Sequence, residues 1–565
     1  MKYCHNCGNK VNDADCFCAE CGTRLVLEDA PDLYGQKDDA VYGYIFTNVK
    51  FLSKKLSVSR DQLLELINTF INARSEQGVQ YMLLDVSDYE VKTMSREKIS
   101  LQPTEGWETH QRLLMDRYSY DVDKCGINVC YLYIIGGHDI IPMPSVGKHI
   151  LPKDGRIDTD IPYSSLYGSK TEAMIDDGTI FQSAQMLFVG RLPLAADATF
   201  NDLINCFQNT VDVAYNGLDS HRMYGQCDPH WKGVSGSVTC DLHEAGCFPE
   251  YEADSKYYYR SLWLTPYVTV KDNTIDEVFD RRASCYYFNM HGSNAPQVPQ
   301  FIGVGMNEGE GSYIGICPEH IASAECLNML VTEACYGARF IGRKKNESML
   351  LSAMSGKTVV YIGSSRIAFG AGDENCVSGV YPISSADIIA NAALTALHCG
   401  VPAGVALYYA RQAVVEAQKI SSVYTPTTLM EFNLFGDPSL AMYYDEGKSS
   451  VLSKYEKGVM PKAPICETLL PVKIERKDLY NRAGDNSILN IIRQKVDDNV
   501  MQISKTIEMH LYANYNISPR HLESVIQYKT SFGEKSCLYQ YLYGDFYVLV
   551  ETDGTDKICN VLTTK

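Results

Sequence analysis

Short apolar runs recur along the chain, and the two clearest, at 285–290 and 329–334, do not alternate polar with apolar positions. Continuous runs of this kind are typical of parallel β-strands that helices cover on both faces. The full set of strand-like runs comprises residues 81–85, 130–135, 186–190, 285–290, 329–334 and 358–363. Helical or loop stretches separate them, so the pattern predicts an α/β fold with a doubly wound, mostly parallel sheet flanked by helices.

Helical spacing fills part of the intervals between these runs. Residues 61–71 carry apolar side chains at helical positions, and the alanine-rich segments 386–398 and 403–418 are expected to be helices that cover the sheet. Gly400-Val-Pro402 separates the last two, because proline interrupts a helix. The aromatic-rich interval 205–283 gives no clear assignment.

The length of 565 residues indicates more than one domain. After the α/β region, residues 485–512 have helical spacing, and residues 547–561 resemble a hairpin that turns at Asp553-Gly554. We therefore expect a C-terminal α+β module. The predicted division is a cysteine-rich segment at 1–25, a linker at 26–44, the α/β domain at 45–445, a second linker at 446–464 and the C-terminal module at 465–565.

Two strand-like runs end in residues suited to nucleophilic catalysis. One ends at His291-Gly292 and the other at Cys335. Reactive groups collect at the carboxyl ends of parallel strands, and a cysteine nucleophile needs a base beside it because only the thiolate attacks efficiently. Glycine after the histidine leaves the backbone open to a substrate carbonyl, so the N–H groups of Gly292 and Cys335 could form an oxyanion hole. Taken singly, each residue is better explained as a buried core residue, because a lone buried cysteine is usually a small core hydrophobe and a lone histidine a satisfied polar group.

The surrounding sequence resembles a known family. Six ordered segments are similar to gingipain-type (C25-like) peptidases, which belong with the caspase-like cysteine endopeptidases, and the likeness runs from about residue 45 to about residue 445. These segments are Tyr131–Asp139, Phe188–Pro193, Asn289–Ser293, Glu333–Gly337, Tyr361–Arg366 and Phe435–Leu440. The resemblance implies a caspase-like fold, with Cys335 as nucleophile, His291 as general base and acid, and Gly292 and Cys335 as oxyanion donors.

The resemblance also implies a pocket for a basic P1 side chain. Thr159-Asp-Ile-Pro-Tyr163 is similar to the family's pocket segment, which makes Asp160 the S1 candidate. A buried carboxylate there would bind Arg or Lys through a charge-assisted hydrogen bond. The alternative is a solvated loop aspartate. Arg366 lies after another strand and could enter the pocket and reverse its charge preference.

The chain departs from the family pattern beside the histidine. Gingipain-type peptidases carry an acidic residue, a little upstream of the pocket aspartate, that orients the catalytic histidine. In this chain Lys148 and His149 stand in that part of the sequence, and Asp154 is the nearest carboxylate. We therefore expect a Cys/His dyad rather than a triad. Met290 also stands where the family often has glycine.

The N-terminal segment contains two matched cysteine pairs. Cys4-x-x-Cys7 and Cys18-x-x-Cys21 are each followed by glycine. Four thiolates at this spacing suit tetrahedral Zn²⁺, and the segment resembles a short zinc ribbon whose metal would supply its folding free energy. Because four thiolates fill the coordination sphere, the predicted role is structural. Redox-active cysteine pairs are the alternative. Cys16 is a spare thiol.

Composition and charge narrow the cellular context. The net charge of −18 argues against nonspecific binding to nucleic acid. The chain shows no secretory signal and no apolar run of the roughly twenty residues that a membrane helix requires. The remaining cysteines lack disulfide-framework spacing. We expect a cytoplasmic protein, unlike the secreted gingipains, with no nucleic-acid or membrane partner.

The sequence thus predicts an intracellular cysteine endopeptidase that acts on protein or peptide substrates, with zinc as a structural cofactor and none for catalysis. Cleavage after Arg or Lys is the expected specificity. The zinc ribbon or the C-terminal module could gate the site or recruit a regulatory protein partner, and Arg343-Lys-Lys345 is a conceivable self-cleavage site or a solvated charge cluster. The alternative is a catalytically inactive caspase-like scaffold that recruits partners through its accessory segments.

Overall fold

A computed structural model describes most of the α/β domain and the strands of the terminal segments. The described residues are 2–3, 10–11, 41–92, 97–151, 154–176, 178–181, 183, 185–218, 223–244, 283–293, 301–304, 312–376, 379–418, 424–441, 494–495, 522–529, 535–543, 546–552 and 558–564.

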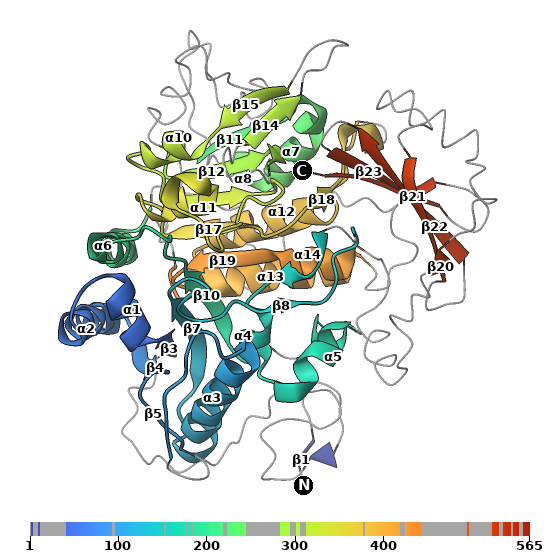
Figure 1. The fold of residues 1–565 in the computed structure, drawn as a ribbon. Coiled ribbons are helices and arrows are strands. Elements are labelled where there is room, and N and C mark those ends of the chain that lie inside the picture. The colour runs from blue at the N-terminus through green and yellow to red at the C-terminus, as the bar shows by residue number, and fades with distance from the viewer. Residues whose placement is uncertain are drawn as a thin grey trace.

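A nine-stranded sheet forms the centre of the molecule (Figure 1). Its spatial order is β11-β12-β16-β17-β19-β10-β7-β3-β4. In chain order the strands are β3 (Val41–Thr47), β4 (Val79–Asp85), β7 (Val129–Ile135), β10 (Phe188–Leu192), β11 (Met223–Cys227), β12 (Cys285–Asn289), β16 (Met329–Thr332), β17 (Val360–Ser364) and β19 (Phe432–Gly436).

The sheet consists of two parallel halves that run in opposite directions. Every neighbouring pair of strands is parallel except β17 and β19, which are antiparallel. The carboxyl ends of β11, β12, β16 and β17 therefore share one edge, and those of the other five strands lie at the opposite edge. A largely parallel sheet in an α/β fold agrees with the prediction, and the parallel pairing of β12 with β16 places the ends of these two strands together.

Helices flank this sheet (Figure 1). Helix α2 packs on β4 and α6, α13 packs on β10 and β19, and α12 packs on β16. Ser59 and Gln62 form a capping box at the start of α2, which satisfies backbone N–H groups of its first turn. The longer helices are α2 (Arg60–Glu76), α3 (Trp107–Ser119), α6 (Phe200–Asn216), α12 (Ala386–His398) and α13 (Ala403–Ala417). The shorter ones include α1 (Val49–Lys55), α4 (Ile161–Ser165), α5 (Thr171–Asp176), α7 (Lys232–Val238), α8 (Cys240–Glu244), α10 (Pro318–Ala322), α11 (Met349–Met354) and α14 (Thr425–Glu431).

The predicted strands and covering helices are present within a few residues of their expected bounds. The sequence pattern missed β3, β11 and β19. Strand β3 begins at Val41, inside the expected linker 26–44, so the α/β domain starts before residue 45. Strand β11 lies in the interval 205–283 that had no assignment, because Gly225 and Gln226 interrupt its apolar run.

Three of the motif segments tie distant parts of the domain together. Asp437 is fully buried, pairs with Arg74 of α2 at 3.0 Å and accepts a hydrogen bond from the Tyr81 hydroxyl. Gly436 has φ +129°, and a Cβ there would lie 2.0 Å from the Val359 carbonyl oxygen, so the turn requires glycine. The buried Arg191 donates to the Gly136 and Ile141 carbonyls. These segments support the fold and lie away from the β12 and β16 ends.

The C-terminal strands, drawn in red in Figure 1, belong to a second, six-stranded sheet. It contains β20 (Gln494–Lys495), β21 (Leu522–Lys529), β22 (Lys535–Tyr543), β23 (Phe546–Thr552) and β24 (Ile558–Thr564), and β18 (Phe369–Gly370) joins it from the α/β domain. β23 and β24 pair in antiparallel register, as the predicted hairpin requires, and its expected turn at Asp553-Gly554 lies outside the described residues. Residues 494–495 are a strand and not part of the helix predicted at 485–512; the rest of that range lies outside the described residues.

Among the described residues, no helix combines the length and hydropathy needed to cross a membrane.

Candidate active site

His291 and Cys335 follow neighbouring strands at the same height. Strands β12 and β16 are adjacent and parallel, with Phe288 paired to Thr332. His291 and Cys335 each lie three residues beyond these paired positions. The structure thus brings both strand ends to one edge of the sheet, as the sequence predicts.

Gly292 lies directly against the backbone of Cys335. A Cβ at Gly292 would be 1.8 Å from the Cys335 carbonyl oxygen and 2.8 Å from its nitrogen. No residue other than glycine fits this approach without moving the Cys335 backbone. His291 and Gly292 form the short strand β13, which pairs with β14 (Phe301–Val304). The proposed oxyanion residues are therefore in contact, in a backbone arrangement that two strand pairings fix.

The His291 imidazole has an aromatic neighbour and an acidic one. Its ring centroid lies 4.4 Å from that of Trp231, at an interplanar angle of 57°. Its Nε2 lies 3.8 Å from Oδ2 of Asp228. The imidazole side chain is 15% exposed, whereas the Asp228 side chain is fully buried. A buried carboxylate beside an imidazole favours the imidazolium and restrains the ring.

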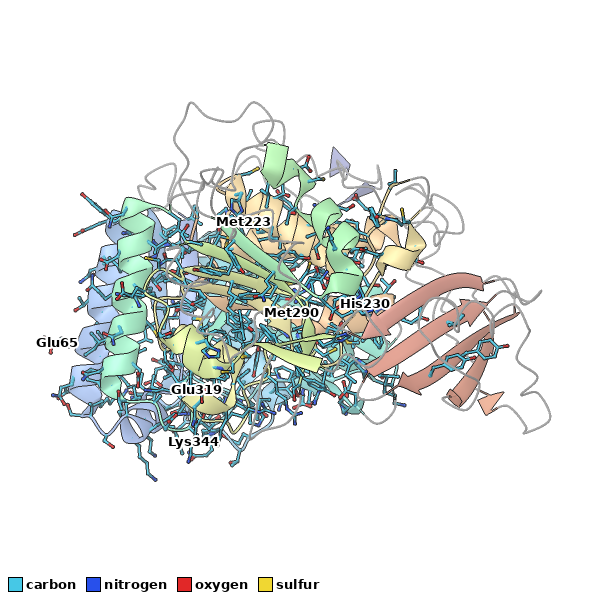
Figure 2. All side chains as sticks on the ribbon, turned by 90° about the horizontal axis from the view of Figure 1, so that it is seen from above. Glu65, Met223, His230, Met290, Glu319 and Lys344 are labelled. Atoms are coloured by element: carbon cyan, nitrogen blue, oxygen red, sulfur yellow. The ribbon has the colours of Figure 1, made fainter. Side chains whose placement is uncertain are left out.

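Asp228 is the site residue that the sequence analysis missed. It follows β11 directly, and its backbone N–H donates to the Asn289 carbonyl at 2.8 Å, which joins the ends of β11 and β12. Its other oxygen accepts hydrogen bonds from the backbone and Nδ1 of His230, at 2.9 and 2.7 Å. Figure 2 shows His230 and Met290, which precedes His291, in the same central region of the molecule. The signal was present in the sequence, since Asp228 is a charged residue at a strand end.

The Cys335 thiol is held from the opposite side by the segment after β17. Cys335 is 5% exposed, and its Sγ donates to the Ala368 carbonyl at 3.6 Å. Tyr336, the next residue, has φ +56°, a conformation uncommon for a residue with a side chain. Its backbone N–H donates to the Arg366 carbonyl at 2.8 Å. The thiol therefore lies at a strained turn that residues 366–368 brace.

A buried polar cluster lies behind this turn. Asp154 accepts hydrogen bonds from the Tyr336 hydroxyl at 2.5 Å and from the Ile367 backbone N–H at 3.0 Å. Nε2 of His149 donates to the Ile367 carbonyl at 2.9 Å and lies 3.7 Å from the Glu431 carboxyl. Burial raises the pKa of Glu431 to about 7. Asp154 and His149 thus brace the cysteine turn and are not the partners of His291.

Asp160 is buried as predicted, but its carboxylate already has a partner. Both of its oxygens accept from the Arg191 guanidinium, at 2.9 and 2.7 Å. Asp160 is 6% exposed and Arg191 is fully buried. Because an internal guanidinium engages both oxygens, the prediction that Asp160 floors the S1 pocket is wrong. The sequence alone does not indicate this pairing, because Arg191 lies in β10, whereas Asp160 precedes α4.

The backbone of Arg366 contacts Tyr336, the residue after the thiol, and its side chain is itself paired. Its guanidinium is 2.9 Å from Asp158 of β9 (Ile157–Asp158), and the two side chains are 16% and 14% exposed. Burial raises the pKa of Asp158, and the charge of Arg366 opposes that shift. An acidic and a basic group, each partly exposed, are thus paired with each other next to the segment whose backbone contacts Tyr336.

A comparison of the sequence with models of known families shows which family the chain belongs to. The sequence model of peptidase family C25 matches residues 54–443, most of the chain and nearly the range predicted from the motifs. The chain belongs to peptidase family C25. This C25 peptidase is a cysteine endopeptidase. No curated protein matches its sequence at a significant level.

Solved structures show distant similarity to this C25 peptidase. The crystal structure of the Arg-specific cysteine proteinase gingipain R (RgpB) has 14% sequence identity and a TM-score of 0.44, covering 72% of this chain and 79% of that one. A complex of the pro- and mature domains of Porphyromonas gingivalis RgpB has 15% sequence identity and a TM-score of 0.43, covering 71% of this chain and 79% of that one. A third structure, described as a protease, has 11% sequence identity and a TM-score of 0.41, covering 94% of this chain and 98% of that one. The family assignment comes from the sequence match and not from these scores.

Of the other sites predicted for the C25 peptidase, the structure describes the conceivable self-cleavage segment but not the zinc cysteines. The zinc candidates Cys4, Cys7, Cys18 and Cys21 lie outside the described residues. Among the residues that the structure describes, no group of side chains forms a metal-binding cluster. Strands β1 (Lys2–Tyr3) and β2 (Lys10–Val11) pair on either side of the first cysteine pair. In the conceivable self-cleavage segment, Arg343 is buried and Lys345 pairs with Asp202 at 2.7 Å. That segment is therefore folded against the domain and is not a fully solvated cluster.

Proposed function

We propose that this C25 peptidase hydrolyses peptide bonds with Cys335 as the nucleophile and His291 as general base and acid. The observation that carries the proposal is the placement of both residues at the same height on adjacent strand ends, with Gly292 against the Cys335 backbone. A thiolate attacks a carbonyl, and a nearby imidazole can take the thiol proton.

The proposed reaction proceeds through an acyl-enzyme. The Cys335 thiolate attacks the scissile carbonyl, and the resulting oxyanion accepts hydrogen bonds from the N–H groups of Gly292 and Cys335. His291 then protonates the leaving amine, and the peptide bond breaks to leave a thioester on Cys335. His291 next removes a proton from water, which hydrolyses the thioester and restores the thiol.

Asp228 completes the proposed constellation as a positioning residue. Its distance of 3.8 Å from His291 Nε2 and its full burial support this role. A carboxylate there would stabilise the imidazolium that forms when the thiol loses its proton. The proposal thus replaces the predicted dyad with three residues from three neighbouring strand ends.

We further propose a basic P1 residue, which the motif resemblance implies, with Asp158 in place of Asp160 as its carboxylate. The partial exposure of Asp158 supports this choice, as does its pairing with Arg366, whose carbonyl accepts a hydrogen bond from the Tyr336 N–H. A basic side chain would have to share Asp158 with Arg366, so the pocket contains both a partner and a competitor for it. Peptides that differ only at P1, with Arg, Lys, Asp or Leu, test the assignment, and faster cleavage after Asp would show that Arg366 dominates the pocket.

The accessory features belong to the same proposal. We propose that Cys4, Cys7, Cys18 and Cys21 hold a structural Zn²⁺, supported by their spacing and by the β1–β2 pairing around the first pair. An intracellular location and a regulatory protein partner at the zinc ribbon or the C-terminal module are proposed from the sequence alone.

Labelling of Cys335 tests the catalytic proposal. A peptidyl chloromethyl ketone should alkylate Cys335 faster than any other thiol of the chain, and His291→Gln should slow that reaction at least about a hundredfold. Iodoacetamide, which has no peptide part, provides the control for simple accessibility. Equal rates at Cys335 and at the other thiols would instead favour the scaffold alternative.

A further inference from the structure

The segment that holds the thiol continues directly into strand β18. The Ala368 carbonyl accepts from Cys335 Sγ, and Phe369–Gly370 is the strand that follows. Asp387 anchors the far end of this segment by accepting from the Ala371 N–H at 2.7 Å. Asp373 accepts from the backbone N–H groups at the start of α7, at 2.7 and 2.8 Å. β18 is thus a fixed strand that begins one residue from the contact with the thiol.

The last strand of the described chain covers this edge. β24 pairs with β18 in antiparallel register, Thr564 with Phe369 and Thr563 with Gly370. On the other side of β18, Gly370 forms a bridge to Ser385. Paired antiparallel residues have Cα atoms about 4.5–5.5 Å apart, so the β24 backbone lies next to the residue that follows Ala368. Figure 1 shows the C-terminal sheet beside β18.

A peptide substrate needs an edge of this kind. An extended chain bound by a protein commonly adds a strand to an exposed sheet edge, where backbone hydrogen bonds give affinity. Cys335 Sγ contacts the Ala368 carbonyl, so a substrate with its scissile carbonyl at this thiol comes close to β18, which begins at the next residue. One edge of β18 is already occupied by β24.

We propose that β24 is an internal ligand of the substrate-binding edge, and that an extended peptide must displace it from β18. This inference depends on the proposed function of Cys335. The pairing supports displacement, because β18 and β24 share two residue pairs, whereas β24 is joined to β23 along most of its length. The C-terminal sheet would therefore leave the edge as a unit, with its own strand pairs intact.

Hydrogen exchange of the full-length protein tests the displacement. One sample has Cys335 alkylated by iodoacetamide, and the other by a tetrapeptide chloromethyl ketone with the P1 residue that the substrate panel selects. Of the amides of Thr563 and Thr564, the one that faces β18 should exchange faster only in the tetrapeptide sample, whereas the amides of residues 546–552, which pair within the C-terminal sheet, should not change in either sample. Equal protection of both threonine amides in the two samples would overturn the proposal.

Proline variants give a second, kinetic test. Neighbouring N–H groups of a strand point in opposite directions, so either Thr563→Pro or Thr564→Pro removes a donor that faces β18. The proline variant that removes this donor should react with the tetrapeptide reagent roughly five- to twentyfold faster than the wild type, which is the factor that one or two backbone hydrogen bonds supply. It should react with iodoacetamide at the wild-type rate. Thr563→Ala and Thr564→Ala keep the backbone donors and should behave as wild type.

The outcomes separate the two proposals. If the enzyme hydrolyses peptides but neither proline variant reacts faster and the protection of Thr563 and Thr564 does not change, the β24 proposal alone fails. If the tetrapeptide reagent labels Cys335 no faster than the other thiols in the wild type and in both proline variants, the proposed function fails and the β24 proposal fails with it. If proline unfolds the C-terminal sheet, the exchange experiment on the wild-type chain still shows whether a bound peptide displaces β24 from β18.

Discussion

The buried carboxylate of Asp228 lies 3.8 Å from Nε2 of His291, and the two residues come from the ends of adjacent strands β11 and β12. If Asp228 stabilises the imidazolium during the reaction, Asp228→Asn should lower kcat by about 10²–10⁴-fold with a smaller effect on KM. Steady-state kinetics with one peptide substrate at several pH values measures this change.

Asp437→Asn is the matched control for Asp228→Asn. Asp437 is another fully buried carboxylate, but it pairs with Arg74, away from the thiol. Its replacement should lower the melting temperature while the folded enzyme keeps its kcat. An Asp228→Asn variant that loses only stability in the same way would show that Asp228 is structural.

The hydrogen bond between Tyr336 and Asp154 makes a second prediction. Tyr336→Phe removes the hydroxyl that braces the strained turn after the thiol, so kcat should fall about tenfold or more through misplacement of Sγ. Tyr44→Phe is the control, because the Tyr44 hydroxyl makes a similar buried bond to Asp121 at 2.7 Å in another part of the domain. Both variants should lose about 1–3 kcal/mol in urea denaturation. Equal kcat values for the two variants would contradict the bracing role.

The buried Glu431 predicts a pH dependence of stability. Burial raises its pKa from an ordinary 4.5 to about 7, so between these values the folded state keeps a proton that the unfolded state has lost. Stability should therefore fall as the pH rises from about 4.5 to 7, by up to about 3 kcal/mol from this group. Glu431→Gln should flatten that fall in urea denaturation at pH 5 and pH 7.5. Glu65→Gln, at an exposed position visible in Figure 2, should leave it unchanged, and a persistent slope in Glu431→Gln would contradict the assignment.

Much of the domain was predictable because its buried strands are uninterrupted apolar runs. The end residues His291 and Cys335 followed from the rule that parallel strands present their carboxyl ends at one edge. Asp228 was missed although the same rule applies to it, since Gly225 and Gln226 disguise β11. Asp160 was misassigned because its pairing with Arg191 is a contact between distant segments. The pairing of β18 with β24 has no sequence signal, because two residues are too few to form a pattern.

The proposed zinc site is tested by metal analysis of the full-length protein. We expect one Zn²⁺ per chain, its loss in the Cys4→Ser/Cys7→Ser double variant, and its retention in Cys16→Ser, which changes the spare thiol of the same segment. Peptidase activity should be independent of this metal, because the role proposed for it is structural. Disulfides within the two cysteine pairs in place of zinc would support the redox alternative.

The most direct measurement is the kcat/KM of Cys335→Ala for a cleaved peptide, compared with wild type and with Cys206→Ala. Cys206 is a matched control because it is also buried, and its thiol likewise donates to a backbone carbonyl, that of Met354 at 3.1 Å. The account predicts that Cys335→Ala stays folded and loses at least about 10³-fold in kcat/KM, whereas folded Cys206→Ala retains turnover. Peptide hydrolysis by Cys335→Ala at a rate near that of the wild type would contradict the account.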